Sequence, residues 1–200
     1  MNTSHLNRRE ALRKIALGGI GAASAPLWVQ NLSAAALAHS HQKPAAVEGA
    51  AEWSPKFLNA RQNELVITLS ELIIPQTDTP GAKAAKVNEF VDAVLDDADG
   101  NEKKEFARGL RWMDSRSNEL FGADFVKATP EQQTALLTII SSRSNKALED
   151  QIGVEFFNAI KSLTITGYYT SEVGMREELG DDGNLFFEDY PGCTHPEHKA

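Results

Sequence analysis

The chain has 200 residues, which suffices for one domain and a leader, and its 42% hydrophobic and 24% charged residues are typical of a globular protein rather than a disordered one. The formal net charge of −8, with no basic stripe after the N-terminal segment, argues against a nucleic-acid-binding surface. The single cysteine, Cys193, excludes a disulfide within the chain.

Residues 1–38 are organised like a cleaved export signal. Two adjacent arginines, Arg8 and Arg9, stand in a basic start, and an apolar run rich in glycine and alanine follows over residues 15–27. This run is too short and too interrupted to predict a membrane-spanning helix. Paired arginines before a weakly apolar run resemble a twin-arginine (Tat) signal, which exports folded proteins. The alternative is a signal for the general secretory route with a basic start by chance. Two small-x-small cleavage sites are available: Ala34-Ala35-Ala36 and Ala36-Leu37-Ala38.

A polar, alanine-rich linker is expected over residues 39–54, followed by a helical domain over residues 55–166. Apolar residues recur at helical spacing in five stretches of this domain, and no stretch alternates with the period of a strand. The sequence therefore predicts an all-α fold in which a compact bundle of about five helices closes around one core. The predicted helices lie at about 55–74, 82–97, 102–121, from 130 onward, and 147–164.

Three local patterns predict where helices begin and end. Ser54 before Pro55 favours the start of the first helix, and Pro75 favours its end because proline disrupts helical geometry at the residue before it. Thr129, followed three positions later by Gln132, has the pattern of a capping box at the start of the fourth helix.

An irregular, glycine-punctuated and acidic tail is expected over residues 167–200. Its aromatic residues either fold back on the helices or cover the surface of another protein, and exposed aromatic groups are common anchors of interfaces. The predicted partner-contact residues are Tyr168, Tyr169, Phe186, Phe187 and Tyr190.

Three stretches carry a resemblance to a known family: ELIIPQTDTPGAKAAKVNEFVDAVLDD at residues 71–97, GYYTS at 167–171 and YPGC at 190–193. Together with the twin-arginine leader, they resemble the gluconate 2-dehydrogenase subunit 3 family. The resemblance implies a small exported subunit of a complex with a large FAD-dependent sugar or sugar-acid dehydrogenase of the glucose-methanol-choline type. A multihaem cytochrome c often joins such complexes. FAD and haem c would then belong to the partners, and the membrane association to the whole complex.

The sequence shows no constellation typical of an active site. Its five histidines lie in the leader or near the two ends of the mature chain, and it has no dinucleotide fingerprint, phosphate loop or covalent haem motif. The acidic groups at residues 96–99 and 181–182 could bind calcium, but solvated charge at helix ends is the simpler interpretation. His39 and His41 are expected to be solvated. Cys193, with His195 and His198, could hold a soft metal, although a disulfide to a cysteine of the partner is the favoured role of Cys193.

Two hypotheses from different classes follow. The first is a non-catalytic small subunit that escorts and stabilises a periplasmic flavoprotein at the membrane. The second is a stand-alone periplasmic helical protein that binds a ligand or carries a metal through its His and Cys ends. An independent enzyme ranks last, because the predicted core offers no catalytic groups by type.

Overall fold

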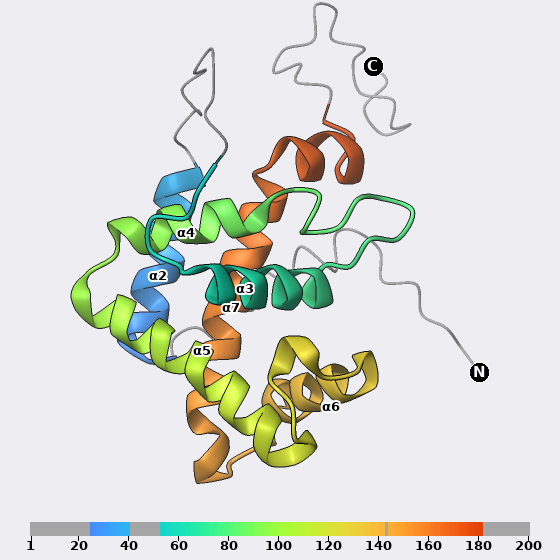
Figure 1. Ribbon diagram of the computed structural model, residues 1–200. Helices are drawn as coiled ribbons and strands as arrows, with labels where there is room; N and C mark the ends of the chain where they lie inside the picture. The colour runs from blue at the N-terminus through green and yellow to red at the C-terminus, as the bar shows by residue number, and fades with distance from the viewer. Residues whose placement is uncertain (1–24, 41–52, 143, 182–200) are drawn as a thin grey trace, which may run out of the picture.

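The structure is a computed structural model that describes residues 25–40, 53–142 and 144–181. These residues form helices and no strand, so the predicted all-α fold is confirmed (Figure 1). Among the described helices, none combines the length and apolarity that a membrane span requires. The α-helices are α2 (Leu27–Ser40), α3 (Ala60–Ile73), α4 (Val87–Asp97), α5 (Gly100–Phe121), α6 (Pro130–Ser141) and α7 (Gln151–Tyr169). Three shorter helices are η1 (Phe125–Lys127), η2 (Leu148–Asp150) and the π-helix η3 (Gly174–Glu178).

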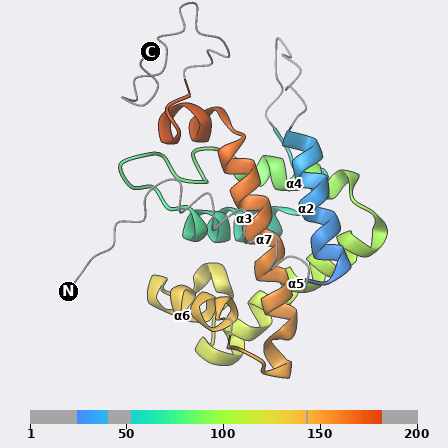
Figure 2. The ribbon, with the colours of Figure 1, turned by 180° about the vertical axis from the view of Figure 1, so that it is seen from behind.

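Helix α7 is the centre of the molecule and contacts the other five described α-helices (Figures 1 and 2). A helix surrounded on most sides needs apolar residues over most of its circumference, and α7 has them. Its fully buried side chains include Phe156, Ile160, Leu163 and Tyr168. The five predicted helices correspond to α3–α7, and they close around this one core.

The first predicted helix begins later than expected. Helix α3 starts at Ala60, with Asn59 as its N-cap in a capping box with Gln62, so the predicted start at Ser54 and Pro55 is wrong.

Residues 56–58 lie along α4 instead, because the buried carboxylate of Asp92 binds their backbone. Asp92 accepts hydrogen bonds from the N–H groups of Lys56, Phe57 and Leu58 at 2.7, 3.1 and 2.8 Å. Only 2% of the surface of Asp92 is exposed, and a buried carboxylate needs hydrogen-bond donors. These three hydrogen bonds tie residues 56–58 to α4, and α3 begins after them.

The other helix ends agree more closely with the sequence patterns. The capping box of Thr129 and Gln132 is present at the start of α6, and Gly122 ends α5 in the left-handed conformation. Helix α4 begins at Val87 rather than near residue 82, because residues 82–86 form turns and Lys86 adopts a left-handed φ of 53°.

Helix α7 continues to Tyr169, and η3 follows it. Residues 167–169 therefore belong to the helical body, and the boundary predicted between the helical domain and the tail at residue 166 falls inside α7. Apolar contact with the core extends the helix past Thr164, since Tyr168 is buried in it.

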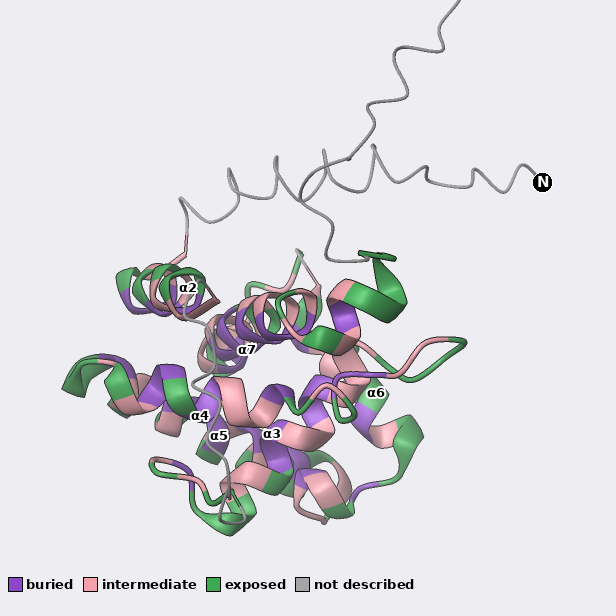
Figure 3. Ribbon diagram, turned by 90° about the horizontal axis from the view of Figure 1, so that it is seen from above, coloured by how far each residue is buried: buried purple, intermediate pink, exposed green. Residues whose placement is uncertain are grey.

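Helix α2 comprises residues that were assigned to the end of the leader and the start of the linker. It packs against α7, α4 and α5, and Figure 3 shows buried residues on α2 and α7 where these helices lie side by side. Its buried residues are Trp28, Val29, Leu32 and Ala36. His39, expected in solvent, lies in the last turn of α2 with its Nε2 atom 3.1 Å from a carboxylate oxygen of Asp97.

Candidate functional site

The loop between α3 and α4 (residues 74–86, the α3–α4 loop) is organised by one carboxylate. Glu71, in the last turn of α3, accepts a hydrogen bond from the backbone N–H of Gln76 at 2.9 Å and another from that of Lys83 at 2.8 Å. A backbone hydrogen bond from Ala82 to Ile74, at 2.9 Å, closes the loop at its base. Charge-assisted hydrogen bonds of this kind are about twice as strong as neutral ones, so Glu71 holds both limbs of the loop.

Gly81 is required by the close approach of this carboxylate. A Cβ atom at position 81 would lie 2.5 Å from the backbone nitrogen of Gln76 and 2.6 Å from Oε1 of Glu71. Glycine alone leaves room for the carboxylate between the two limbs of the loop.

The other side of the α3–α4 loop is held by α7 and η3. The hydroxyl of Tyr168 donates to the carbonyl of Pro80 at 2.7 Å, and the hydroxyl of Thr79 donates to the carboxylate of Glu178 at 2.6 Å. Tyr168 and Tyr169 meet edge to face, with ring centroids 5.1 Å apart. Burial raises the pKa of both phenols, so both stay neutral at physiological pH.

The tip of the loop remains exposed at Pro75, Gln76, Thr77 and Asp78. A hydrogen bond from the Thr77 hydroxyl, 2.9 Å long, lowers the pKa of Asp78 and keeps its carboxylate ionised. A loop whose base is held from two sides while its tip faces solvent is pre-organised for contact, because little conformational entropy remains to be lost on binding. The α3–α4 loop is therefore the candidate recognition element.

Of the five predicted contact residues, the structure describes two, Tyr168 and Tyr169, and they differ in exposure. Tyr168 has 1% of its surface exposed and uses its hydroxyl within the chain, so its assignment to a partner contact is wrong. Tyr169, beside it, is half-buried and reaches the surface. The remaining predicted residues lie outside the described residues: Phe186, Phe187, Tyr190, Cys193, His195, His198, Arg8 and Arg9.

Glu71 was missed by the sequence analysis, although it lies in the stretch that carries the family resemblance. A glutamate in the last turn of a predicted helix is typical of an ordinary solvated charge. The only available signal was its place before Pro75 and Gly81, which together predict a tight turn that must return close to the end of the helix.

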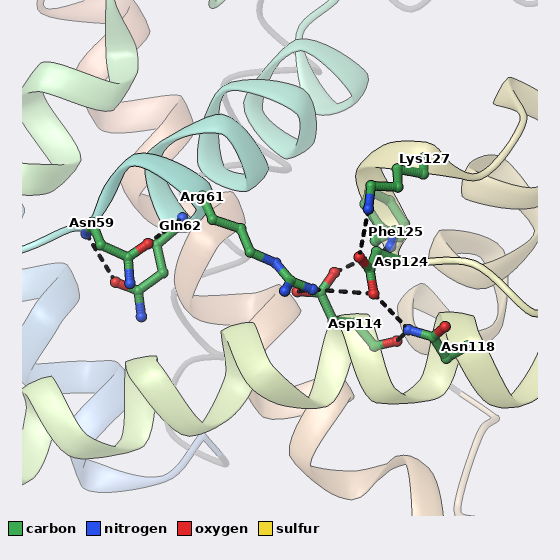
Figure 4. Close-up of polar contacts among 8 residues, drawn as sticks. All are labelled: Asn59, Arg61, Gln62, Asp114, Asn118, Asp124, Phe125 and Lys127. Atoms are coloured by element: carbon green, nitrogen blue, oxygen red, sulfur yellow. Dashed lines mark hydrogen bonds and ion pairs between the residues drawn. The ribbon is translucent and has the colours of Figure 1, made fainter.

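A second polar cluster joins α3, α5 and η1 (Figure 4). The guanidinium of Arg61 lies 2.8 Å from the carboxylate of Asp114 and 3.1 Å from that of Asp124, and Lys127 lies 3.3 Å from Asp124. Asp114 also accepts the backbone N–H of Phe125 at 3.1 Å. These contacts hold η1 against the two helices.

A pocket of about 270 Å³ adjoins this cluster. A hydrogen bond from Asn118 lowers the pKa of Asp124, as do Lys127 and Arg61, so this carboxylate is ionised and serves as a permanent ion-pair partner. The pocket combines paired ions with apolar side chains, and the residues that line it include no histidine, cysteine or serine. Its lining residues are Arg61, Glu64, Leu65, Asp114, Asp124, Val126 and Lys127. The arrangement stabilises the fold and supplies no nucleophile–base pair.

The acidic group at the end of α4 has structural contacts. Asp99 caps α5, Asp97 pairs with His39, and Asp96 lies 3.5 Å from Lys56. Within the described residues, no three metal-ligating side chains come together.

The described residues thus form an all-α domain with a braced, exposed loop and a pocket lined by paired ions. The model of the family described as gluconate 2-dehydrogenase subunit 3 matches residues 60–184, more than half of the chain, and the chain belongs to this family. The match runs from the start of α3 through the α3–α4 loop and η3. The chain is thus an accessory subunit by family, which implies a multi-subunit complex. No curated protein and no solved structure matches it.

Proposed function

We propose that the chain is the non-catalytic small subunit of a periplasmic FAD-dependent sugar or sugar-acid dehydrogenase, and that the catalytic flavoprotein needs it for Tat export, maturation and stability. The observation that carries the proposal is the family match over residues 60–184. FAD belongs to the large subunit and haem c to a cytochrome subunit, and the complex associates with the membrane.

The export role follows from the order of events in making a flavoprotein. A large subunit that takes up FAD in the cytoplasm is folded before it crosses the membrane, and Tat signals serve folded proteins. A large subunit without a signal of its own crosses when it is bound to a small subunit that carries Arg8 and Arg9. Binding also stabilises the folded large subunit by mass action.

The contact surface of the proposal is the tip of the α3–α4 loop together with Tyr169. The loop supplies Gln76, Thr77 and Asp78 in a conformation held by Glu71. Tyr169, which packs edge to face on Tyr168, supplies an aromatic anchor. Phe186, Phe187 and Tyr190 would extend the aromatic surface, and Cys193 would form a disulfide with a cysteine of the large subunit in the oxidising periplasm.

The first test is co-purification of the C-terminally tagged chain from a periplasmic extract. The expected result is a large partner with a flavin absorbance spectrum and sugar or sugar-acid dehydrogenase activity. A colourless monomer from cells that express the neighbouring genes would contradict the proposal. The metal content of that monomer would then test the stand-alone alternative. Electrophoresis of the complex with and without reductant tests Cys193, because a disulfide makes the two chains migrate together only without reductant.

A signal variant tests the export role separately. Arg8→Lys with Arg9→Lys keeps the charge but removes the arginine pair, and both the chain and its partner should then remain in the cytoplasm as a complex. Arg13→Lys is the matched control, because it changes an arginine in the same basic segment outside the pair. Normal periplasmic activity with the double variant would exclude the Tat route.

A further inference from the structure

Helix α2 is an integral part of the core, although its residues overlap the leader predicted from the sequence. Leu32 and Ala36 have no exposed surface, Trp28 retains 7% and Val29 retains 4%. These four side chains lie on one face of α2 and join the same apolar cluster as α7, α4 and α5.

Both cleavage sites that the sequence offers lie inside this helix. Cutting after Ala36 or after Ala38 would leave the body without most of α2, and the faces of α7, α4 and α5 that it covers would become solvent-exposed. A cut after Ala38 would also leave His39 and its contact with Asp97 without the helix that positions them. Large exposed apolar faces of this kind are rare on soluble proteins.

The order of folding and cleavage makes such a cut harder still. A peptidase needs an extended backbone, so α2 would have to unfold locally before it is cut. In Tat export, which the proposed function includes, the chain is already folded when it meets the peptidase, and α2 is then already packed.

The sequence offers an earlier end to the leader. The carbonyl of Pro26 accepts the first hydrogen bonds of α2, from the N–H groups of Val29 and Gln30 at 3.0 and 3.2 Å, so the folded body begins close to Ala25. Just before it stand Ala22, Ala23 and Ser24, all small residues. A leader of 24 residues, with an apolar run that starts at residue 15, fits the usual 15–30 residues of an export signal better than one of 38.

We propose that residues 25–40, which include helix α2, remain in the mature protein, and that the export signal ends before Ala25. The processing step rests on export, which is part of the proposed function. The retention of α2 rests on its packing against the core.

The N-terminus of the exported chain tests the proposal directly. The C-terminally tagged full chain is purified from the periplasm, and its N-terminus is determined by intact mass and by N-terminal sequencing. A first residue at or before Ala25 is expected. A first residue at Leu37 or His39 would overturn the proposal.

Two matched variants on the same helix give an independent readout. Leu32→Ala should lower the Tm of the purified mature protein by about 5–15 °C, because a fully buried leucine is lost. Leu37→Ala, at a position with 58% exposure, should leave the Tm within about 2 °C. Equal Tm values for the Leu32→Ala variant and the unaltered protein would overturn the proposal.

The two parts of the test separate this inference from the export role. A chain that stays in the cytoplasm contradicts the export role. The comparison of the two leucine variants, made on that cytoplasmic chain, still decides whether α2 belongs to the folded body.

Discussion

At the scale of single residues, Glu71 accounts for the conformation of the α3–α4 loop. Its two carboxylate oxygens accept hydrogen bonds from two backbone segments that are seven residues apart, Gln76 and Lys83. No other side chain among the described residues bonds the backbone of both limbs. Glu71 is therefore the side chain that joins the two limbs, while Tyr168 and Glu178 hold the loop from its other side, and the contribution of Glu71 can be measured.

Glu71→Gln should open the loop without unfolding the helices. The amide side chain can accept through one oxygen only, so one limb loses its acceptor, at a cost of about 1–3 kcal/mol in the free energy of unfolding. Hydrogen exchange should show faster exchange at the amides of Gln76 and Lys83. Glu64→Gln, at an exposed position of the same helix, is the control and should change neither. Unchanged exchange at both amides in Glu71→Gln would contradict the role of the carboxylate.

The buried phenol of Tyr168 should make the protein less stable at alkaline pH. Burial raises the pKa of Tyr168 in the folded state above the value of about 10 in the unfolded chain. A group with a raised folded-state pKa contributes stability that is complete below the unfolded pKa and is lost as the pH rises through the folded pKa. The free energy of unfolding should therefore fall as the pH rises above about 10.

Tyr168→Phe should reduce that alkaline loss and lower stability at pH 7. The loss at pH 7 should be about 1 kcal/mol, because the carbonyl of Pro80 loses its donor. Urea unfolding at pH 7 and pH 10.5 measures both effects. Tyr169→Phe is the comparison for neutral pH: among the described residues its hydroxyl has no hydrogen-bond partner, so the change at pH 7 should be small. An equal loss at pH 7 for both variants would contradict the role of the Tyr168 hydroxyl.

At the scale of elements, α5 and α7 approach each other closely because α5 has glycine at the contact. A Cβ atom at Gly109 would overlap the ring of Phe156 on α7, and Phe156 also meets Phe106 edge to face at 5.1 Å between ring centroids. Glycine inside a helix normally lowers stability relative to alanine, so the packing here outweighs the propensity of the residue.

Gly109→Ala should therefore lower the free energy of unfolding, by about 1–3 kcal/mol, although alanine favours the helix. Gly100→Ala is the matched control on the same helix, because a Cβ atom there has nothing within 4 Å. The control should be neutral or slightly stabilising in urea unfolding. Stabilisation by Gly109→Ala would mean that α5 and α7 are not packed as described.

At the scale of the whole molecule, α2 should unfold together with the rest of the chain. A helix of 14 residues is marginal by itself in water, so α2 depends on its contacts with α7, α4 and α5. Trp28 is its buried reporter, and Trp112, which donates to the carbonyl of Glu149 at 3.0 Å, reports on the contact between α5 and the start of α7.

We expect the protein to unfold in urea in a single cooperative transition, which both tryptophans report. Fluorotryptophan labelling with ¹⁹F NMR resolves the signals without substituting any residue, and the Trp28 and Trp112 signals should change at the same urea concentration as the far-UV circular dichroism. Loss of the Trp28 signal at a clearly lower urea concentration would show that α2 is only loosely attached.

What could be predicted from the sequence depended on interactions between neighbours along the chain. The apolar spacing predicted the five helices α3–α7. Thr129 and Gln132 predicted the start of α6, because a capping box involves only residues three apart. The stretch from residue 71 to residue 97 indicated the family, which the match over residues 60–184 confirmed.

Only the tertiary structure decided the features that join distant residues. Asp92 binds the backbone more than 30 positions before it and so delays the start of α3, and Tyr168 turns inward to Pro80, 88 positions away, instead of facing a partner. In both cases the pattern of neighbouring residues is compatible with an exposed or a buried position. Desolvation of the polar group determines the outcome, because a buried polar atom must find its partner wherever the fold brings one.

The same reason applies to α2. The apolar run from residue 15 to residue 27 predicts a leader by its composition, but composition does not mark where a leader ends and a core helix begins. Trp28, Leu32 and Ala36 belong to the body because α7, α4 and α5 provide an apolar surface to bury them. The sequence by itself determined the all-α class, the five later helices and the family, all of which rest on local periodicity and motif. The tertiary structure decided helix α2 and the conformation of the α3–α4 loop, because both depend on contacts with segments distant in sequence.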